Sequence, residues 1–291
     1  MSAVPAAAAP TAAAPTAAAL TAAAPIAAEP VLDVPLAGLA GIGLAELTER
    51  ASLLTRIDRK YVLPRSQLEA VLGDLDPEVR VLDIDGVRSS AYESVYFDTP
   101  ELTSFLMAAH PRRRRFKIRT RTYLDTAQSY LEVKTRGGRG ATVKDRLPYA
   151  LDDRATLTTA GRRYTDFVLD EADIAGVQGQ ELVPTLMTRY VRTTLFVPES
   201  SSRATIDTGL SWAMLAARRS AGPAGQERRL DRPHLAIVET KSGARASAVD
   251  RILWAHGHRP ATISKYGTGM AALESDLPAN KWAPVLRRYF R

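Results

Sequence analysis

RFKIRTRTYLDTAQSYLEVKTRGGRGATVKDR, residues 115–146, is the stretch that decides the fold, because apolar and charged residues alternate in it. Successive side chains of a β-strand point to opposite faces, so the alternation predicts a meander of strands. One face of this meander carries the charged residues Lys117, Arg119, Arg121, Glu132, Lys134, Lys144 and Arg146. The opposite face carries Phe116, Ile118, Thr120, Leu131 and Val133.

The charged face of the meander has two interpretations. Strands often turn a polar face to water, and such a face needs no function. Like charges side by side on neighbouring strands are destabilising, however. Six cations against one carboxylate on successive strands therefore indicate a polyanion that lies across them.

Composition limits the classes of protein to consider. The chain has 291 residues, enough for one large domain or two small ones, and a formal net charge of +7. This charge favours an acidic partner, which could be nucleic acid, an anionic membrane or a phosphate-rich small molecule. There is no cysteine, which excludes disulfides and thiolate metal sites, and the four histidines form no metal-ligand pattern. The chain contains no run of 18 apolar residues, so the sequence does not predict a membrane-spanning segment.

The chain divides into three parts. Residues 1–35 consist mainly of Ala, Pro and Thr and are predicted to be a disordered tail. Residues 36–278 form the main domain, and residues 279–291 form a basic C-terminal tail without a predicted element.

Helix and strand patterns alternate along the main domain. Helices are predicted at 44–50, 101–109, 152–175, 246–256 and 267–275, and a capping box of Ser66 and Glu69 predicts another. The apolar stripe of the helix at 152–175 consists of Leu157, Phe167, Val168 and Ile174. Strands besides the meander are predicted at 56–62, 79–84, 91–98, 186–197, 203–210 and 235–241, with an exposed loop at 213–233.

These patterns predict an α+β fold with eight or nine mostly antiparallel strands. Nearly every strand brings a charged face, and one flat sheet cannot bury so many charges. A closed antiparallel barrel of about eight strands, with a polar lumen and flanking helices, solves this problem.

The charged residues expected to line the lumen point to phosphate chemistry. The cations are Lys60, Arg119, Arg121, Lys134, Lys144, Arg192, Arg203 and Lys265, and the carboxylates are Asp58, Glu132, Asp207 and Glu239. Arginine pairs bidentately with phosphate oxygens, and lysine supplies a point charge. Carboxylates suit Mg²⁺ or Mn²⁺, which take oxygen ligands and bridge substrate phosphates.

Other chemistries have less support. There is no P-loop motif, and the glycines at 137–140 are more typical of a hairpin turn. No nucleophilic Ser or Cys stands beside a His, so covalent acyl chemistry has no support. Phosphoryl transfer needs neither, because it can operate through positioning and electrostatics.

The order of short motifs resembles one known family. The motifs are K-Y, Y-F-D-T, K-I-R-T-R-T-Y, L-E-V-K, K-D-R, Y-V-R, R-A-T-I-D-T, E-T-K and S-K-Y. Their order resembles the catalytic domain of the vacuolar transporter chaperone (VTC) polyphosphate polymerases, members of the triphosphate tunnel metalloenzymes. The resemblance extends from about residue 54 to residue 275.

This resemblance implies an antiparallel barrel around a basic tunnel, in which the γ-phosphate of ATP is transferred to inorganic polyphosphate with Mn²⁺ or Mg²⁺. The implied phosphate-binding residues are Lys60, Arg119, Arg121, Lys134, Lys144, Arg192, Arg203 and Lys265, and all except Lys144 are implied to be catalytic. Glu239 is the implied metal ligand, and Glu132 and Asp207 would orient the cations or assist the metal.

The sequence departs from tunnel triphosphatases in one place. They have glutamates where this chain has Arg56 and Asp58, and the loss of an acid favours a more basic, polymerase-like tunnel. We expect a cytoplasmic protein with ATP and polyphosphate as partners and no nucleic acid, and recruitment of a membrane partner stays open.

Two other functions stay open. The first is a tunnel triphosphatase or nucleotide cyclase, because one fold serves several activities. The second is a module that only binds polyphosphate or nucleic acid. Nucleic-acid binders add aromatic residues for base stacking, and Tyr123, Tyr130 and Tyr190 are the few candidates.

Overall fold

The meander at residues 115–146 is present as the antiparallel strands β5 (Arg115–Tyr123), β6 (Gln128–Arg136) and β7 (Thr142–Tyr149). The computed structural model describes residues 36–51, 57–110, 112–136, 142–215 and 228–290. Arg56, the turn at 137–140, the tail at 1–35 and most of the loop predicted at 213–233 lie outside the described residues. Phe116, Ile118, Thr120, Leu131 and Val133 are all buried, which confirms the predicted faces.

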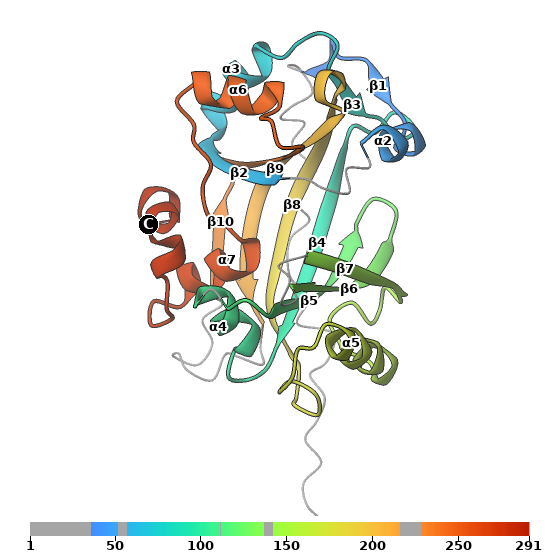
Figure 1. Ribbon diagram of the computed structural model, residues 1–291, viewed down its shortest axis with the longest axis vertical. Helices are drawn as coiled ribbons and strands as arrows, with labels where there is room; N and C mark the ends of the chain where they lie inside the picture. The colour runs from blue at the N-terminus through green and yellow to red at the C-terminus, as the bar shows by residue number, and fades with distance from the viewer. Residues whose placement is uncertain (1–35, 52–56, 111, 137–141, 216–227, 291) are drawn as a thin grey trace, which may run out of the picture.

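Eight more strands complete an eleven-stranded sheet (Figure 1). They are β1 (Gly41–Ile42), β2 (Ile57–Pro64), β3 (Arg80–Leu82), β4 (Ser89–Asp98), β8 (Val183–Val197), β9 (Ser202–Met214), β10 (Arg229–Arg232) and β11 (Leu235–Ser242). The hydrogen-bonded path is β2-β11-β9-β8-β4-β5-β6-β7, and every pair along it is antiparallel. The short strand β10 lies within the stretch that was predicted to be a loop.

The sheet is not closed into a barrel, so this part of the fold prediction needs correction. The path begins at β2 and ends at β7, and within the described residues these two strands do not pair. The sheet curls nonetheless, since the segment 261–264 contacts both β2 and β5. The Ala261 amide donates to the Lys60 carbonyl of β2 at 2.7 Å, and Lys117 of β5 donates to Ser264 Oγ at 2.9 Å.

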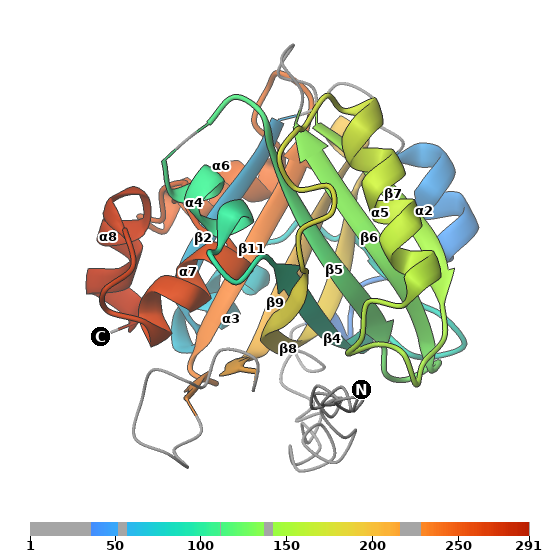
Figure 2. The ribbon, with the colours of Figure 1, turned by 90° about the horizontal axis from the view of Figure 1, so that it is seen from below.

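The helices cover both faces of the sheet (Figure 2). They are α2 (Leu44–Arg50), α3 (Arg65–Gly73), α4 (Thr103–Ala109), α5 (Thr159–Glu171), α6 (Ala248–Ala255), α7 (Lys265–Leu273) and α8 (Ala283–Val285). The chain also forms three short helical turns, η2 (Pro198–Ser200), η4 (Asn280–Trp282) and η5 (Leu286–Phe290). In the described residues, none of the helices has the length and apolar character needed to cross a membrane.

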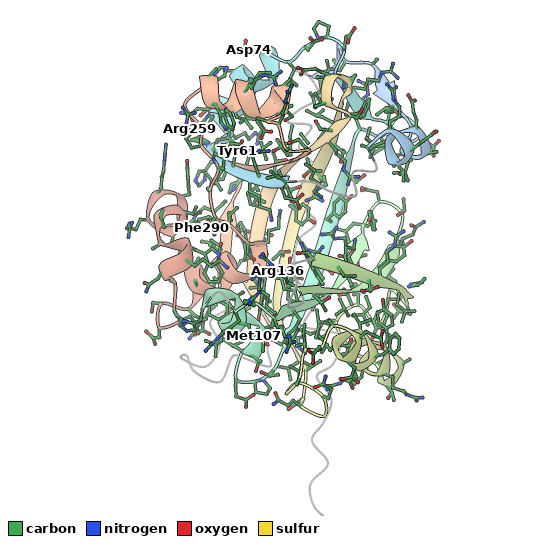
Figure 3. The ribbon with its side chains drawn as sticks, viewed as in Figure 1. Tyr61, Asp74, Met107, Arg136, Arg259 and Phe290 are labelled. Carbon is green, nitrogen blue, oxygen red and sulfur yellow. The ribbon has the colours of Figure 1, made fainter. Side chains whose placement is uncertain are left out.

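Three apolar clusters determine where charge can gather. On the outer face, α3 and α6 pack on β2, β9 and β11, and α5 packs on β5 and β6. Tyr61 illustrates this packing, since it lies below α6 and its hydroxyl donates to Asp250 at 2.7 Å (Figure 3). On the inner face, α4, α7 and the C-terminal helices form a plug around Phe105, Tyr266 and Trp212. The rest of the inner face is left to charged residues.

Two local predictions were wrong. The capping box of Ser66 and Glu69 is absent, because the N-cap of α3 is Pro64, two residues before Ser66, and the helix begins at Arg65. Strand β2 leads directly into this helix, and the Arg65 amide donates to the His234 carbonyl at 2.7 Å. The helix predicted at 152–175 is the shorter α5, so Leu157 and Ile174 of the predicted apolar stripe lie outside it, and Phe167 is 63% exposed.

Candidate functional site

The inner face of the sheet gathers the cations predicted from the sequence. Strand register places them side by side, with Arg119 opposite Glu132, Lys134 opposite Lys144 and Lys60 opposite Glu239. Three carboxylates divide the cations into groups centred on Glu132, Asp207 and Glu239.

Glu132 on β6 is the centre of the first group. Arg119 donates to one of its oxygens from Nη2 at 2.6 Å and from Nε at 2.8 Å, and Lys144 contacts the other at 2.7 Å. Arg121 lies 3.8 Å from the carboxylate. Burial alone would raise the pKa of Glu132, but the three cations hold it well below its usual range. Glu132 therefore orients the side chains of Arg119 and Lys144, and both of its oxygens are already occupied.

Asp207 on β9 is the centre of the second group. The Arg192 guanidinium binds it bidentately, with contacts of 2.6 and 2.8 Å, and Lys265 also donates to it. Burial opposes the charge of Asp207, yet Arg192 and Lys265 hold its pKa well below the usual range. The geometry supports an orienting role here too, since both oxygens are in use.

Lys265 is the first residue of α7, and the position of that helix is set by Asp98 at the end of β4. Asp98 accepts hydrogen bonds from the amides of Ser104 and Phe105, at 2.8 and 2.9 Å, and from the Tyr266 hydroxyl at 2.6 Å. The helix was predicted to begin at 267 and begins two residues earlier, at Lys265. The Y-F-D-T and S-K-Y motifs thus meet in one buried contact, which the sequence did not predict.

Glu239 on β11 differs from the other two carboxylates. Its oxygens lie 3.9 Å from Lys60 and 3.8 Å from Lys241, beyond normal hydrogen-bond length. Burial opposes its charge, but Lys60 and Lys241 lower its pKa to about 2. Glu239 is therefore ionised and, among the described residues, receives no close hydrogen bond.

Glu239 suits a divalent metal ion that takes few of its ligands from the protein. No group of three His, Cys, Asp or Glu residues that could hold an ion occurs in the described parts of the chain. Mg²⁺ often uses only one or two carboxylates and completes its shell with water and substrate phosphates. The exposed Asp58 lies nearby, since its charge acts on Lys241. A hard divalent ion would therefore need phosphate oxygens as further ligands.

Two lysines of the inner face were missing from the predicted site. Lys117 donates from Nζ to Ser264 Oγ at 2.9 Å, and burial followed by Lys60 and Lys134 moves its pKa far below normal. Burial also lowers the pKa of Lys241 to about 8, with Arg203 acting in the same direction. Both lie at two-residue spacing from a predicted site residue, so the alternation contained the signal.

Tyrosine rings line the wall between the first two groups. Tyr92 and Tyr190 stack with centroids 5.2 Å apart and planes at 3°. The guanidinium carbons of Arg121 and Arg192 lie 5.6 and 5.4 Å from the Tyr92 ring centroid. Lys265 Nζ lies 4.2 Å from that of Tyr190. Tyr190 is 1% exposed, so it packs against the cations and offers no open face to a base.

Several buried hydroxyls on this face lack a hydrogen-bond partner within the described residues. They are the side-chain oxygens of Ser94, Thr188, Tyr190 and Thr205. Buried polar groups are normally paired with protein, ordered water or ligand. These hydroxyls can donate to the oxygens of an anion that occupies the inner face.

The inner face as a whole carries surplus positive charge. Its cations are Lys60, Lys117, Arg119, Arg121, Lys134, Lys144, Arg192, Arg203, Lys241 and Lys265, against Asp58, Glu132, Asp207 and Glu239. Such a surface attracts a ligand with several negative charges in a row.

The chain was compared with proteins of known structure. A Hippeastrum protein titled as an adenylyl cyclase with a dominant triphosphatase activity is 16% identical, with a TM-score of 0.42, covering 75% of this chain and 96% of that one. A Vibrio parahaemolyticus protein titled as an adenylate cyclase is 10% identical, with a TM-score of 0.39, covering 72% and 94%. The PH1012 protein from Pyrococcus horikoshii is 10% identical, with a TM-score of 0.34, covering 69% and 87%. These scores do not bear on the activity of the chain.

No curated protein matches the chain. The family model described as the VTC domain matches residues 55–274, which contain the three carboxylates Glu132, Asp207 and Glu239 and the cations grouped around them. The chain therefore belongs to the VTC domain family.

Proposed function

We propose that the chain is a polyphosphate polymerase that transfers the γ-phosphate of ATP to a growing inorganic polyphosphate. The observation that carries this proposal is the charge balance of the inner face. Glu132 and Asp207 are already bound by cations of their own, and a surplus of lysine and arginine lines the same surface. A row of phosphates would neutralise this surplus.

The residues have distinct parts in the proposed reaction. Arg119 and Arg192 are held in place by carboxylates, so they can grip phosphate oxygens without first being ordered. Lys60, Lys134 and Arg203 add charge around the transferring phosphoryl group, which stabilises the transition state. The attacking phosphate is already ionised, so no general base is required.

Glu239 would hold Mn²⁺ or Mg²⁺, and the bound ion would neutralise charge on phosphate oxygens. The proposed function requires the inner face to hold the chain of phosphates, and it does not require hydrogen-bonded closure of β2 onto β7.

Product analysis tests the proposal. The full chain is incubated with ATP, Mn²⁺ and a short polyphosphate primer, and the products are separated. Long polyphosphate with ADP supports the proposal. Free phosphate as the main product indicates a hydrolase, and cyclic nucleotide indicates a cyclase, and either result refutes it.

The variant Glu239→Gln separates binding from catalysis. We expect it to bind polyphosphate at least as well as the unaltered chain, because a negative charge is removed, and to make no polymer. The matched control is Glu69→Gln on the exposed surface of α3, which keeps full activity. Normal synthesis by Glu239→Gln would remove Glu239 from the proposed metal site.

A further inference from the structure

The inner face continues beyond the candidate site to a second group of cations, Arg115, Arg136 and Lys281, here named the basic rim. Arg115 and Arg136 are direct cross-strand partners at the end of β5 and β6. Lys281 comes from η4, where its Nζ donates to the Ala108 carbonyl at 2.8 Å. Ala108 lies in the last turn of α4, and Arg115 donates to the Arg112 carbonyl just after that helix, so both cations lie at the same end of α4. In agreement, burial and then Arg115 and Arg136 lower the pKa of Lys281.

The basic rim differs from the candidate site in having no acid. In the described part of the chain, none of its three cations forms an ion pair with a carboxylate, and Arg115 instead donates to the Arg112 carbonyl at 2.9 Å. By contrast, the neighbouring exposed Arg114 is paired with Asp173. Like charges directly opposite each other destabilise a sheet. Their retention at one point indicates an anion that binds there.

Lys117 joins the basic rim to the candidate site. It lies on the same face of β5 as Arg115, two residues away, and the charges that lower its pKa, after burial, include Lys60 and Lys134 of the site and Lys281 of the rim. From Arg121 to Arg115 the strand spans about 20 Å. This row of cations ends beside the apolar plug, since Lys281 Nζ lies 5.8 Å from the ring centroid of Trp282, which is buried in the plug.

The two ends of this row differ in chemistry. The end at Tyr123 carries the tyrosines, with Tyr92 and Tyr123 ring centroids 4.8 Å apart and Tyr130 a further 6.1 Å from Tyr123. At the basic rim, Lys281 Nζ lies 5.8 Å from the ring centroid of Trp282, which is 1% exposed and buried in the plug. A base can therefore stack at the tyrosine end only, and the rim suits bare phosphate.

We propose that the basic rim binds the inner phosphates of a long polyphosphate chain and is the exit for the growing polymer, while the nucleoside of ATP lies at the tyrosine end. This proposal deepens the proposed function and rests on it for the direction of growth. The binding part stands on the geometry of the rim alone.

Binding measurements test the rim separately from catalysis. Affinities for long-chain polyphosphate and for tripolyphosphate are measured by calorimetry, without ATP, on the unaltered chain, Arg136→Gln and Lys281→Gln. The matched control is Arg163→Gln, which removes one exposed charge on α5. We expect each rim variant to lose roughly tenfold in affinity for the long chain, the factor for one charge-assisted contact, and much less for tripolyphosphate.

Three outcomes decide the proposal. A selective loss for the long chain supports it. An equal loss of affinity for both ligands would place the rim within the triphosphate site and overturn the proposal. A loss of affinity no greater than that of Arg163→Gln would show that the rim binds neither ligand, and it too would overturn the proposal. Melting temperatures identify a variant that fails to fold, and Arg136→Gln carries the test if the loss of the Ala108 contact unfolds Lys281→Gln.

Product length tests the direction of growth. With ATP and primer, the rim variants are expected to release shorter polymers than Arg163→Gln does, and unchanged lengths would overturn the exit. If the unaltered chain makes no polymer, the proposed function fails, while the ratio of binding affinities still decides whether the rim binds long chains.

Discussion

At the scale of single residues, the most informative group is Lys241, whose charge changes near neutral pH. Burial lowers its pKa to about 8, and Arg203 and Arg192 act in the same direction against Glu239. Phosphate binding uses the protonated form, so we expect the affinity for tripolyphosphate to fall by up to about tenfold between pH 8 and pH 9. Calorimetric titrations at pH 7, 8 and 9 measure this fall.

The variant Lys241→Arg is the control for this pH dependence, because arginine stays charged throughout the range. It should flatten the fall, and a profile identical to that of the unaltered chain would assign the titration to other lysines. Unfolding does not explain the fall. Between the folded pKa near 8 and the ordinary value of 10.5, the unfolded chain binds more protons, so this group makes folding more favourable as pH rises.

Glu132 gives a second prediction, about stability. Glu132→Gln leaves Arg119, Arg121 and Lys144 without their shared charge, and we expect the free energy of unfolding to fall by roughly 3–5 kcal/mol. An added anion should replace the missing carboxylate. Saturating tripolyphosphate should therefore raise the melting temperature of this variant more than that of Glu69→Gln, and a smaller rise would count against the charge argument.

Much of the candidate site could be predicted at this scale, and the reason is periodicity. Arg119, Arg121, Glu132 and Lys134 share one face because strands alternate, whatever lies around them. The pairing of Lys265 with Asp207 could not be predicted, since it joins residues far apart in the sequence through the packing of α7. Lys117 and Lys241 lie two residues from the predicted site residues Arg119 and Glu239, but they were not included in the predicted site.

At the scale of elements, α7 matters most, because it carries Lys265 and packs very closely on β9. A Cβ added at Gly269 would lie 2.3 Å from Cδ1 of Trp212, and the indole of that residue donates to the Lys265 carbonyl at 2.9 Å. No alanine fits there unless the helix shifts. The glycine thus allows the approach that brings Lys265 to the inner face.

Gly269→Ala should therefore lower the free energy of unfolding by about 1–3 kcal/mol and also weaken tripolyphosphate binding, because Lys265 moves with its helix. Chemical denaturation and calorimetry measure the two effects. Gly73→Ala, at the end of α3 with no atom within 4 Å of the added methyl group, is the matched control and should change neither. Normal binding by Gly269→Ala would separate Lys265 from the position of α7.

The elements also show where sequence patterns stop. The faces of β5 and β6 follow from alternation, but closure of the sheet depends on whether β2 reaches β7, which no local pattern determines. Strand β10, Arg229–Arg232, was predicted to be part of a loop, because the stretch 213–233 is rich in Arg, Gly and Pro. Its four residues gain their structure by pairing with β9. The start of α3 is set by the end of β2, so tertiary context replaced the expected cap.

At the scale of the whole molecule, the inner face is divided between charge and an apolar plug, and the C-terminal residues complete the plug. Trp282, Val285, Leu286 and Phe290 are all buried there, beside Trp212 of β9. The Phe290 ring lies 5.3 Å from that of Trp212, and Figure 3 labels it near the end of the chain. The segment 279–291 was predicted to be a tail because of its basic residues. Its large apolar residues pack in the plug, which the sequence did not predict.

Trp282→Ala tests whether this plug supports the site. Trp282 packs on Phe105 of α4, with centroids 5.6 Å apart, and lies where a side chain on Gly267 of α7 would stand. Its loss leaves a cavity between two helices, and we expect the free energy of unfolding to fall by about 3–5 kcal/mol. Lys265 is the first residue of α7, and Lys117 donates to Ser264, the N-cap of that helix, so the affinity for tripolyphosphate should fall as well if α7 moves. Denaturant titration and calorimetry measure both, against Arg287→Gln, an exposed change in the same segment that should alter neither. A chain that loses stability but binds tripolyphosphate normally would show that the plug closes one end of the inner face without positioning its cations.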